Sequence, residues 1–265
     1  MKLFAVVVFC SALCPPLAAR AAGAGLACFD RRPEPDSVRA LRITAHDQAD
    51  EKTVLIVRLY GRRNQQGLGQ LFLRIEKPDA MRGTSLLMLQ RENAESDIYL
   101  ASPQQPTPRA IHGAEREQDM FGTDFSYEDL ERVQYGWLPG EATIVELPAE
   151  PVNDRPAYVV EVKPHHSVWE RIVFSLDEES CRPVWIRFFE PGKTAPSKEL
   201  TTSFDSHVKH GDIWVAHSAL MRDRVHFTTS HLMVDSHTQE ALLPDDGFSV
   251  EGLARAVRGE AKPAP

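Results

Sequence analysis

The stretch Gly69-Gln70-Leu71-Phe72-Leu73-Arg74-Ile75-Glu76-Lys77 has the side-chain alternation of a β-strand. Leu71, Leu73 and Ile75 share one side of an extended chain, because successive side chains of a strand point to opposite faces. Arg74 and Glu76 lie on the other side. We therefore expect Leu71, Leu73 and Ile75 to face an apolar interior and Arg74 and Glu76 to face water.

Similar alternating or β-branched runs recur on both sides of this stretch, which gives about eleven strands. The other ten are expected at Leu41–Ala45, Thr53–Tyr60, Thr84–Leu89, Asp97–Leu100, Ala142–Leu147, Ala157–Lys163, Val168–Leu176, Pro183–Phe189, Ile213–Leu220 and Val225–Val234. Most links between them are short and polar, such as Asp47–Asp50. Links this short favour antiparallel neighbours, because a parallel crossover needs a dozen or more residues. Only Ser102–Asp119 forms a longer irregular stretch.

Helix signals are few. Ser126 is placed to cap a short helix, and Asp129 three residues later completes a capping-box pattern. A second helix is expected to begin near Ser249 and to stop at Gly259. Residues 33–46 are compatible with a helix or a strand, and the strand is preferred because the polar residues that follow would then form a hairpin.

These elements predict a mainly β protein with a few short helices. A sheet of about eleven strands must either curl into a barrel or split into a sandwich, since flat sheets beyond ~10 strands are unusual. Curling creates an apolar interior. That interior is either filled by side chains or open to a ligand.

Composition and charge exclude some classes of protein. The chain has 265 residues, of which 42% are hydrophobic and 26% charged, which is typical of a globular protein. Residues 1–21 carry two basic groups and no acidic one, so their removal changes the formal net charge from -8 to -10. Nucleic-acid binding needs a basic face, so no nucleic-acid partner is expected.

Residues 1–21 have the pattern of an export signal. Lys2 precedes an apolar run from Leu3 to Leu13, and Ala19-Arg20-Ala21 matches a cleavage site near Ala21. A cleaved signal predicts a periplasmic protein. Lipidation is the alternative, but Cys14 directly follows the apolar run without the preceding small residues that a lipoprotein requires.

Two cysteines remain after the signal. Cys28 and Cys181 would lie in a compartment that permits disulfides, and a bond between them is the simplest interpretation. Two unpaired thiols are the alternative.

The usual catalytic signatures are missing from the sequence. It contains no G-x-S-x-G, H-E-x-x-H, Walker or dinucleotide-binding glycine motif and no C-x-x-C. The ten histidines have no spacing that presets a metal site, because adjacent residues such as His165 and His166 point to opposite faces of an extended chain. We expect no enzyme activity, no cofactor and no metal.

The stretch Pro183–Phe189 is apolar on both faces, with Trp185 and Phe189 on one side and Ile186 and Phe188 on the other. One interpretation is a central core strand beneath a covering helix. The other is that one side, including Trp185, lines a lipid cavity.

The most distinctive segment is Phe121-Gly122-Thr123-Asp124-Phe125-Ser126-Tyr127-Glu128-Asp129-Leu130. It resembles the FMGSDFSYEDL signature of the outer membrane lipoprotein-sorting-like family, which is related in fold to the periplasmic lipoprotein carrier LolA. Residues 73–87 and 96–100 resemble the family's preceding strands less specifically. The chain departs from the pattern at Ala101-Ser102, where the family has proline.

The resemblance implies an unclosed antiparallel β-barrel whose apolar concave face holds acyl chains, with no catalytic residue. On this basis the ligand-binding residues are expected to be Leu71, Leu73, Ile75, Phe121, Phe125, Tyr127 and Trp185. We expect the segment Phe121–Leu130 to lie at the rim of the barrel. The expected partners are acyl chains of a lipid or lipoprotein and an RND-type inner-membrane transporter or an outer-membrane acceptor.

The expected domain organisation follows from these elements. A signal peptide at 1–21 and a short N-terminal segment at 22–38 precede a single LolA-like half-barrel at 39–260 and a flexible tail at 261–265. So few mature residues precede the first strand that the long N-terminal lid helix of the lipoprotein carrier is expected to be missing. The expected function is a periplasmic carrier of lipid or lipoprotein acyl chains, and the alternative is an envelope-stress sensor or scaffold that uses the same fold for protein contacts.

Overall fold

The computed structural model describes residues 23–31, 37–138, 140–238, 243 and 245–260. The expected signal peptide and the expected tail at 261–265 lie outside these residues. In this part of the chain, no helix is long and apolar enough to cross a bilayer.

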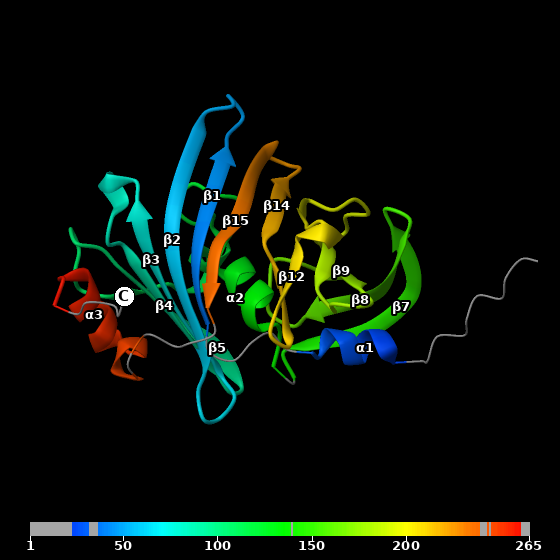
Figure 1. The fold of residues 1–265 in the computed structure, drawn as a ribbon, viewed down its shortest axis with the longest axis horizontal. Coiled ribbons are helices and arrows are strands. Elements are labelled where there is room, and N and C mark those ends of the chain that lie inside the picture. Colours follow the sequence, from blue (N-terminus) through cyan, green and yellow to red (C-terminus); the bar gives the residue numbers. More distant parts are fainter. Residues whose placement is uncertain (1–22, 32–36, 139, 239–242, 244, 261–265) are drawn as a thin grey trace, which may run out of the picture.

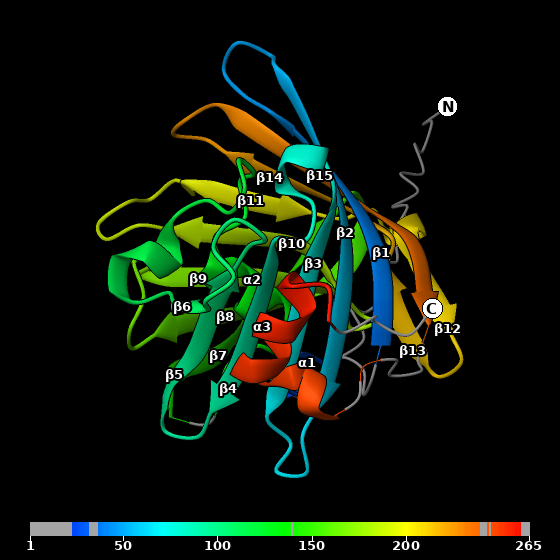
Figure 2. The same cartoon turned by 90° about the vertical axis from the view of Figure 1, so that its left-hand side faces the viewer.

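An antiparallel sheet of thirteen strands curves around a concave face and remains open (Figures 1 and 2). Its order is β6-β5-β4-β3-β2-β1-β15-β14-β11-β10-β9-β8-β7, and β12 pairs with β13 in a separate two-stranded sheet. The strands are β1 (Ser37–His46), β2 (Lys52–Arg63), β3 (Gly69–Lys77), β4 (Ser85–Arg91), β5 (Ala94–Ala101), β6 (Arg109–Ala110), β7 (Ala142–Val152), β8 (Arg155–Pro164), β9 (Arg171–Asp177), β10 (Pro183–Phe189), β11 (Lys198–Thr201), β12 (His207–His210), β13 (Ile213–Ala216), β14 (Ser218–Asp223) and β15 (Thr228–Thr238). The helices are α1 (Ala24–Phe29), α2 (Tyr127–Tyr135) and α3 (Val250–Val257). The expected mainly β, unclosed barrel class is confirmed, although the strands outnumber the eleven expected.

The additional strands are short, and one expected strand is divided. Strands β6, β11 and β12 were not expected from the sequence, and they have two to four residues each. The expected strand Ile213–Leu220 is wrong, because the chain divides at His217 into β13 and β14. The backbone N–H of His217 donates to Ser206 O (2.8 Å), next to the last β12–β13 pair, whereas its C=O accepts from Val234 N of β15 (2.9 Å), so the chain passes from the small sheet to the large one at this residue.

The ambiguous segment before Asp47 is a strand, as preferred. β1 pairs with β2 through a tight turn in which Asp47 Oδ1 accepts hydrogen bonds from the backbone N–H groups of Ala49 (2.8 Å) and Glu51 (2.9 Å). β1 also pairs with β15, so the first and last strands of the chain lie side by side in the middle of the sheet.

The alternation in β3 is confirmed. Leu71, Leu73 and Ile75 are each at most 4% exposed and belong to one large apolar cluster on the concave face. Arg74 and Glu76 are only half-buried on the outer face. The outer face of this half of the sheet is nevertheless not fully exposed to solvent, because α3 covers part of it.

Helix α3 packs on the outer side of β3 to β5 (Figure 2). Leu253, Ala256 and Val257 contribute to a second apolar cluster there, against outward side chains such as Phe72 and Leu87. The helix begins as expected after Ser249.

We expect Ser249→Ala to lower the free energy of unfolding by about 1 kcal/mol. Ser249 Oγ accepts a hydrogen bond from Gly252 N at 2.9 Å, and alanine leaves that N–H without this partner. Chemical denaturation measures the change. Ser249→Asp is the matched control and should retain the stability, since aspartate also caps a helix; an equal loss in both variants would contradict the capping role.

Helix α1 was not expected, and a disulfide holds it to the sheet. Cys28 and Cys181 are bonded with their Cα atoms 5.1 Å apart, so the expected bond is present and the alternative of two free thiols is wrong. The carboxylate of Glu146 in β7 accepts hydrogen bonds from the backbone N–H groups of Gly25 (3.1 Å) and Leu26 (3.4 Å). Helix α1 therefore lies across one end of β7, β8 and β9 (Figure 1).

Candidate functional site

Residues 123–129 of the segment Phe121–Leu130 lie buried inside the concave face, so the expected rim position is wrong for them; only the turn at Phe121 and Gly122 reaches the margin. Asp124, Ser126 and Asp129 are each at most 3% exposed, and Phe125 and Tyr127 join the large apolar cluster. A polar turn can occupy this position because its buried groups find partners.

The capping box expected at the start of α2 is present. Ser126 Oγ accepts a hydrogen bond from Asp129 N, and Asp129 Oδ2 accepts one from Ser126 N, both at 3.0 Å. These two bonds satisfy donors at the helix N-terminus that would otherwise be buried without partners.

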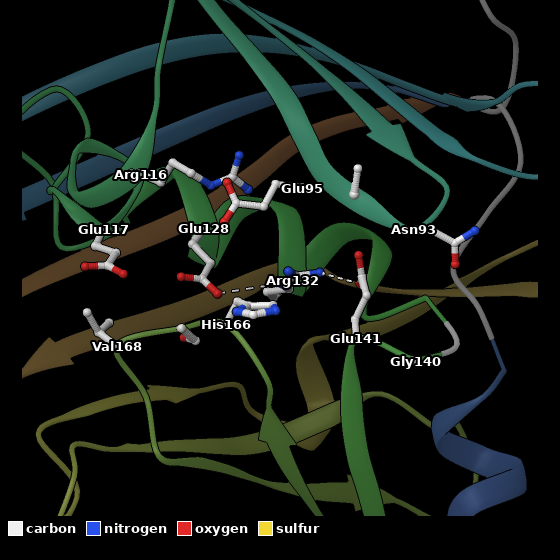
Figure 3. Close-up of a pocket in the computed structure, with 13 residues that line it drawn as sticks. Asn93, Glu95, Arg116, Glu117, Glu128, Arg132, Gly140, Glu141, His166 and Val168 are labelled. Carbon is white, nitrogen blue, oxygen red and sulfur yellow. Dashed lines mark hydrogen bonds and ion pairs between the residues drawn. The ribbon is translucent and has the colours of Figure 1, made fainter.

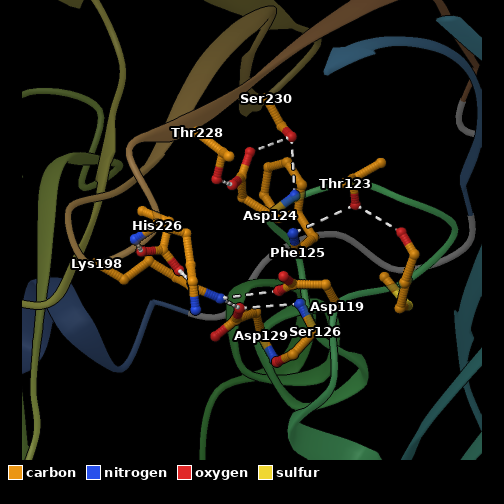
Figure 4. A network of polar contacts seen from close by, with 12 residues as sticks. Asp119, Thr123, Asp124, Phe125, Ser126, Asp129, Lys198, His226, Thr228 and Ser230 are labelled. Carbon is orange, nitrogen blue, oxygen red and sulfur yellow. Dashed lines mark hydrogen bonds and ion pairs between the residues drawn. The ribbon is translucent and has the colours of Figure 1, made fainter. Parts of the chain in front are cut away.

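Asp124 connects this segment to the middle of the sheet (Figure 4). Its backbone N–H donates to Ser230 Oγ at 2.8 Å, and its carboxylate accepts hydrogen bonds from the hydroxyls of Ser230 (2.5 Å) and Thr228. Both hydroxyls belong to β15, so Asp124 fixes the position of the turn on that strand.

Lys198 of β11 connects the segment to the other half of the sheet. Its Nζ lies 3.1 Å from Asp129 Oδ2 and 3.6 Å from Asp119 Oδ1, and its side chain is 5% exposed (Figure 4). Burial alone would lower the pKa of Lys198, but the carboxylates of Asp129 and Asp119 outweigh it and raise the pKa. The ammonium group therefore stays charged.

The far end of α2 packs closely on β3. The Tyr135 hydroxyl donates to Gln70 O at 2.5 Å, and its ring lies over Gly69, where an added Cβ would approach the ring to 2.6 Å. Glycine at position 69 thus permits this contact. Helix α2 therefore fills a large part of the concave face.

A pocket of about 90 Å³ beside α1 has a mainly apolar lining, although Asp30, Arg31, Arg132 and Arg182 also line it. We call it the apolar pocket. Three aromatic rings surround it: the centroid of Phe174 lies 5.1 Å from that of Phe29 and 5.8 Å from that of Trp137. Ile144 of β7 also lines it. The space is small beside the 300–1,000 Å³ that is usual for ligand pockets, so a larger ligand requires α1 or the rings to move.

The residues expected to bind ligand are not at this pocket. Five of them lie in the packed interior cluster: Leu71, Leu73, Ile75, Phe125 and Tyr127. They could contact only a ligand that passes beyond the pocket into this cluster.

Phe121 and Trp185 lie elsewhere. Phe121 is half-buried at the margin of the interior, with its ring edge-on to that of Tyr127 (centroids 6.5 Å apart). The structure corrects the expectation for Trp185, because Ile186 and Phe188 face the interior and Trp185 therefore faces outward. The Arg187 guanidinium lies 4.4 Å from the centre of the Trp185 ring. This side chain, and not the covering helix considered above, packs on Trp185.

Sequence reasoning missed Phe29, Ile144 and Trp137. The expected disulfide was a usable signal for Phe29, because the adjacent Cys28 brings it to the turn that follows β9. No alternation marks Trp137, which lies beyond the end of α2.

A second, polar cleft of about 630 Å³ opens on the other side of Arg132 (Figure 3). Four carboxylates and two guanidiniums line it: Glu95, Glu117, Glu128, Glu141, Arg116 and Arg132. Arg132 also lines the apolar pocket and lies 5.4 Å from the Trp137 ring centroid, so it marks the boundary between the two.

The electrostatics of the cleft centre on Glu128. Burial, opposed by the Arg132 charge, raises its pKa to about 7. Burial likewise raises the pKa of Glu117, against the effect of a hydrogen bond from the Val168 backbone. Among the described residues, no group of three or more His, Cys, Asp or Glu side chains converges to hold a metal ion.

Comparison with known proteins places this geometry in context. A family model described as "Uncharacterized protein" matches residues 67–255. A search of curated proteins found no match. A domain from Vibrio parahaemolyticus named for outer membrane lipoprotein sorting has a TM-score of 0.79 and 20% identity, with 88% of this chain and 98% of that one covered.

Two further solved structures agree. A DUF1329 family protein from Desulfovibrio piger has a TM-score of 0.77 and 15% identity over 87% of this chain and 96% of that one. A LolA superfamily protein from Nitrosomonas europaea has a TM-score of 0.67 and 16% identity over 87% and 98% of the respective chains. Because the family model spans more than half of the sequence, the chain belongs to that family, and its fold is the LolA-like fold of outer membrane lipoprotein-sorting proteins.

Proposed function

We propose that this protein is a non-enzymatic periplasmic carrier that binds an acyl chain of a lipid or lipoprotein. The observation that supports it most directly is the apolar pocket beside α1, which is lined by Phe29, Trp137 and Phe174. Trp137 and Phe174 belong to the interior cluster, and Phe29 packs against it. The LolA-like fold and the export signal expected at residues 1–21 are consistent with this role.

Burial of the chain supplies the binding energy. Each buried methylene contributes ~0.8 kcal/mol, so one long acyl chain could supply on the order of 10 kcal/mol before the cost of ordering it, provided that α1 or the aromatic rings move to enlarge the 90 Å³ pocket. An RND-type transporter or an outer-membrane acceptor would then load the acyl chain onto the protein or take it from the protein.

We expect Ile144→Trp to lower the amount of acyl chain bound per protein molecule, and the affinity for a fatty acid, at least tenfold. The larger side chain fills the 90 Å³ pocket that Ile144 lines. Mass spectrometry of lipids extracted from protein purified from periplasm measures the load, and displacement of a fluorescent fatty acid measures the affinity. Overpacking costs ~1–3 kcal/mol of stability, so thermal unfolding of both proteins is recorded in parallel.

Val145→Trp is the matched control. Val145 is the next residue of β7, is 40% exposed and does not line the pocket. It should keep the wild-type lipid load. If the wild-type protein carries no lipid and binds no fatty acid, the carrier proposal is wrong and a module for protein contacts becomes the better explanation.

A further inference from the structure

The polar cleft beside Arg132 has more negative than positive charge available to a ligand. Arg116 is 7% exposed and already bonded: it lies 2.9 Å from Glu131 Oε2 and donates to Ser96 O at 2.7 Å. Arg132 lies 2.9 Å from Glu141 Oε2. Both guanidiniums thus have carboxylate partners.

Glu128 is paired less closely, through an ion pair with Arg132. It is 6% exposed, and its Oε1 accepts no hydrogen bond within the described part of the chain. Arg132 Nε lies 3.8 Å from this oxygen, beyond hydrogen-bond distance, and the same guanidinium also pairs with Glu131 and Glu141. The carboxyl group of Glu128 has a side-chain hydrogen bond with Ser167 as well. Figure 3 shows the Glu128 side chain directed into the cleft, with Glu117 beside it and Glu95 above. A buried carboxylate that shares one cation with two other carboxylates is stabilised further by a second cation or by a proton.

The shape of the cleft indicates the kind of cation. Its carboxylates do not converge as metal ligands do, and a space of about 630 Å³ accommodates a molecule of many atoms. The carboxylates of Glu95, Glu117 and Glu128 lie at separate positions around the cleft (Figure 3). This arrangement suits a ligand whose positive charges are also separated.

We propose that this cleft binds an organic cation with primary ammonium groups, which pair with Glu128 and Glu117. The ammonium is supplied either by a soluble polyamine or by the amine headgroup of a lipid. This proposal does not depend on acyl-chain binding in the apolar pocket.

Ligand binding is coupled to the proton on Glu128. With a pKa of about 7, its carboxyl is mostly protonated at pH 6 and mostly ionised at pH 8. The ammonium competes with the proton, so affinity should rise about tenfold from pH 6 to pH 8. The other groups that face Glu128 come from α2, the 113–117 turn, β5, the start of β7 and the 165–168 loop: Asp129, Glu131, Arg132, Arg116, Glu117, Glu95, Glu141, His166 and Ser167. The variant Glu128→Gln separates the effect of Glu128 from that of these other groups.

Isothermal titration of the mature protein with spermidine tests the proposal. At pH 7, in buffers of different ionisation enthalpy, the wild type should release a fraction of a proton per ligand bound. Glu128→Gln should bind at least tenfold more weakly at pH 8 and should release no proton. Glu51→Gln, in the exposed β1–β2 turn, is the charge-matched control and should behave as wild type.

A second arm identifies the source of the ammonium. Selective binding to vesicles that contain phosphatidylethanolamine, compared with phosphatidylcholine alone, indicates a lipid headgroup, whereas binding of spermidine alone indicates a soluble amine. Absence of binding in both arms overturns the proposal, and so does a Glu128→Gln variant that binds and releases protons like wild type. A thermal unfolding curve shows whether Glu128→Gln is folded. The variant Glu117→Gln provides a second test of the cleft, because it should also weaken binding at pH 8.

Discussion

Lys198→Met is expected to lower the free energy of unfolding by about 3–5 kcal/mol, the usual cost of removing one partner of a buried ion pair. The variant leaves the carboxylate of Asp129, which is 1% exposed, without its cation at 3.1 Å. Asp119, 3.6 Å away from the same ammonium, then repels it. Urea denaturation of the purified protein measures the loss.

The double variant Lys198→Met/Asp129→Asn distinguishes a loss of charge pairing from a loss of packing. Asparagine can still accept the hydrogen bond from Ser126 N, so the helix cap persists. Removing both charges should therefore recover most of the stability, because no buried charge is left without a partner. A double variant that is as unstable as Lys198→Met would show that the aliphatic part of Lys198, and not its charge, is responsible.

The sequence predicted those parts of the fold that depend on local chemistry. The alternation of β3, the Asp47 turn and the capping box at Ser126 each depend on residues close together in the chain, and the structure contains all three. The resemblance of the segment around Asp124 to the lipoprotein-sorting family gave the correct fold.

The position of that segment could not be predicted locally. A turn that carries Asp124 and Asp129 is expected at the surface unless distant groups satisfy it, and here those groups are Ser230 and Lys198, 106 and 69 residues away along the chain. The same limit applies to β11, whose four residues form a strand because β10 and β14 lie on either side. Such elements depend on tertiary contacts more than on their own pattern.

Cys28→Ser/Cys181→Ser is expected to lower the free energy of unfolding by about 2–5 kcal/mol. The bond joins residues 153 apart in sequence, and the chain-entropy model gives close to 5 kcal/mol for a loop of this length. The lower part of the range allows for residual structure in the unfolded chain, which reduces the entropy that the bond removes. Urea denaturation of wild type and variant, each with and without dithiothreitol, measures the effect.

The disulfide should also control access to the apolar pocket. Cys28 precedes Phe29, whose ring closes the pocket against Phe174, and the remaining polar contacts of α1 with the sheet include two backbone hydrogen bonds to Glu146. Without the bond, α1 should detach more often, because a six-residue helix has little stability of its own. Exchange of a bound fluorescent fatty acid should therefore accelerate in the double serine variant under conditions where it remains folded. Dithiothreitol should accelerate exchange in wild type and have no effect on the variant. If exchange is equally slow in all four cases, α1 does not gate the pocket, and the bond serves stability alone.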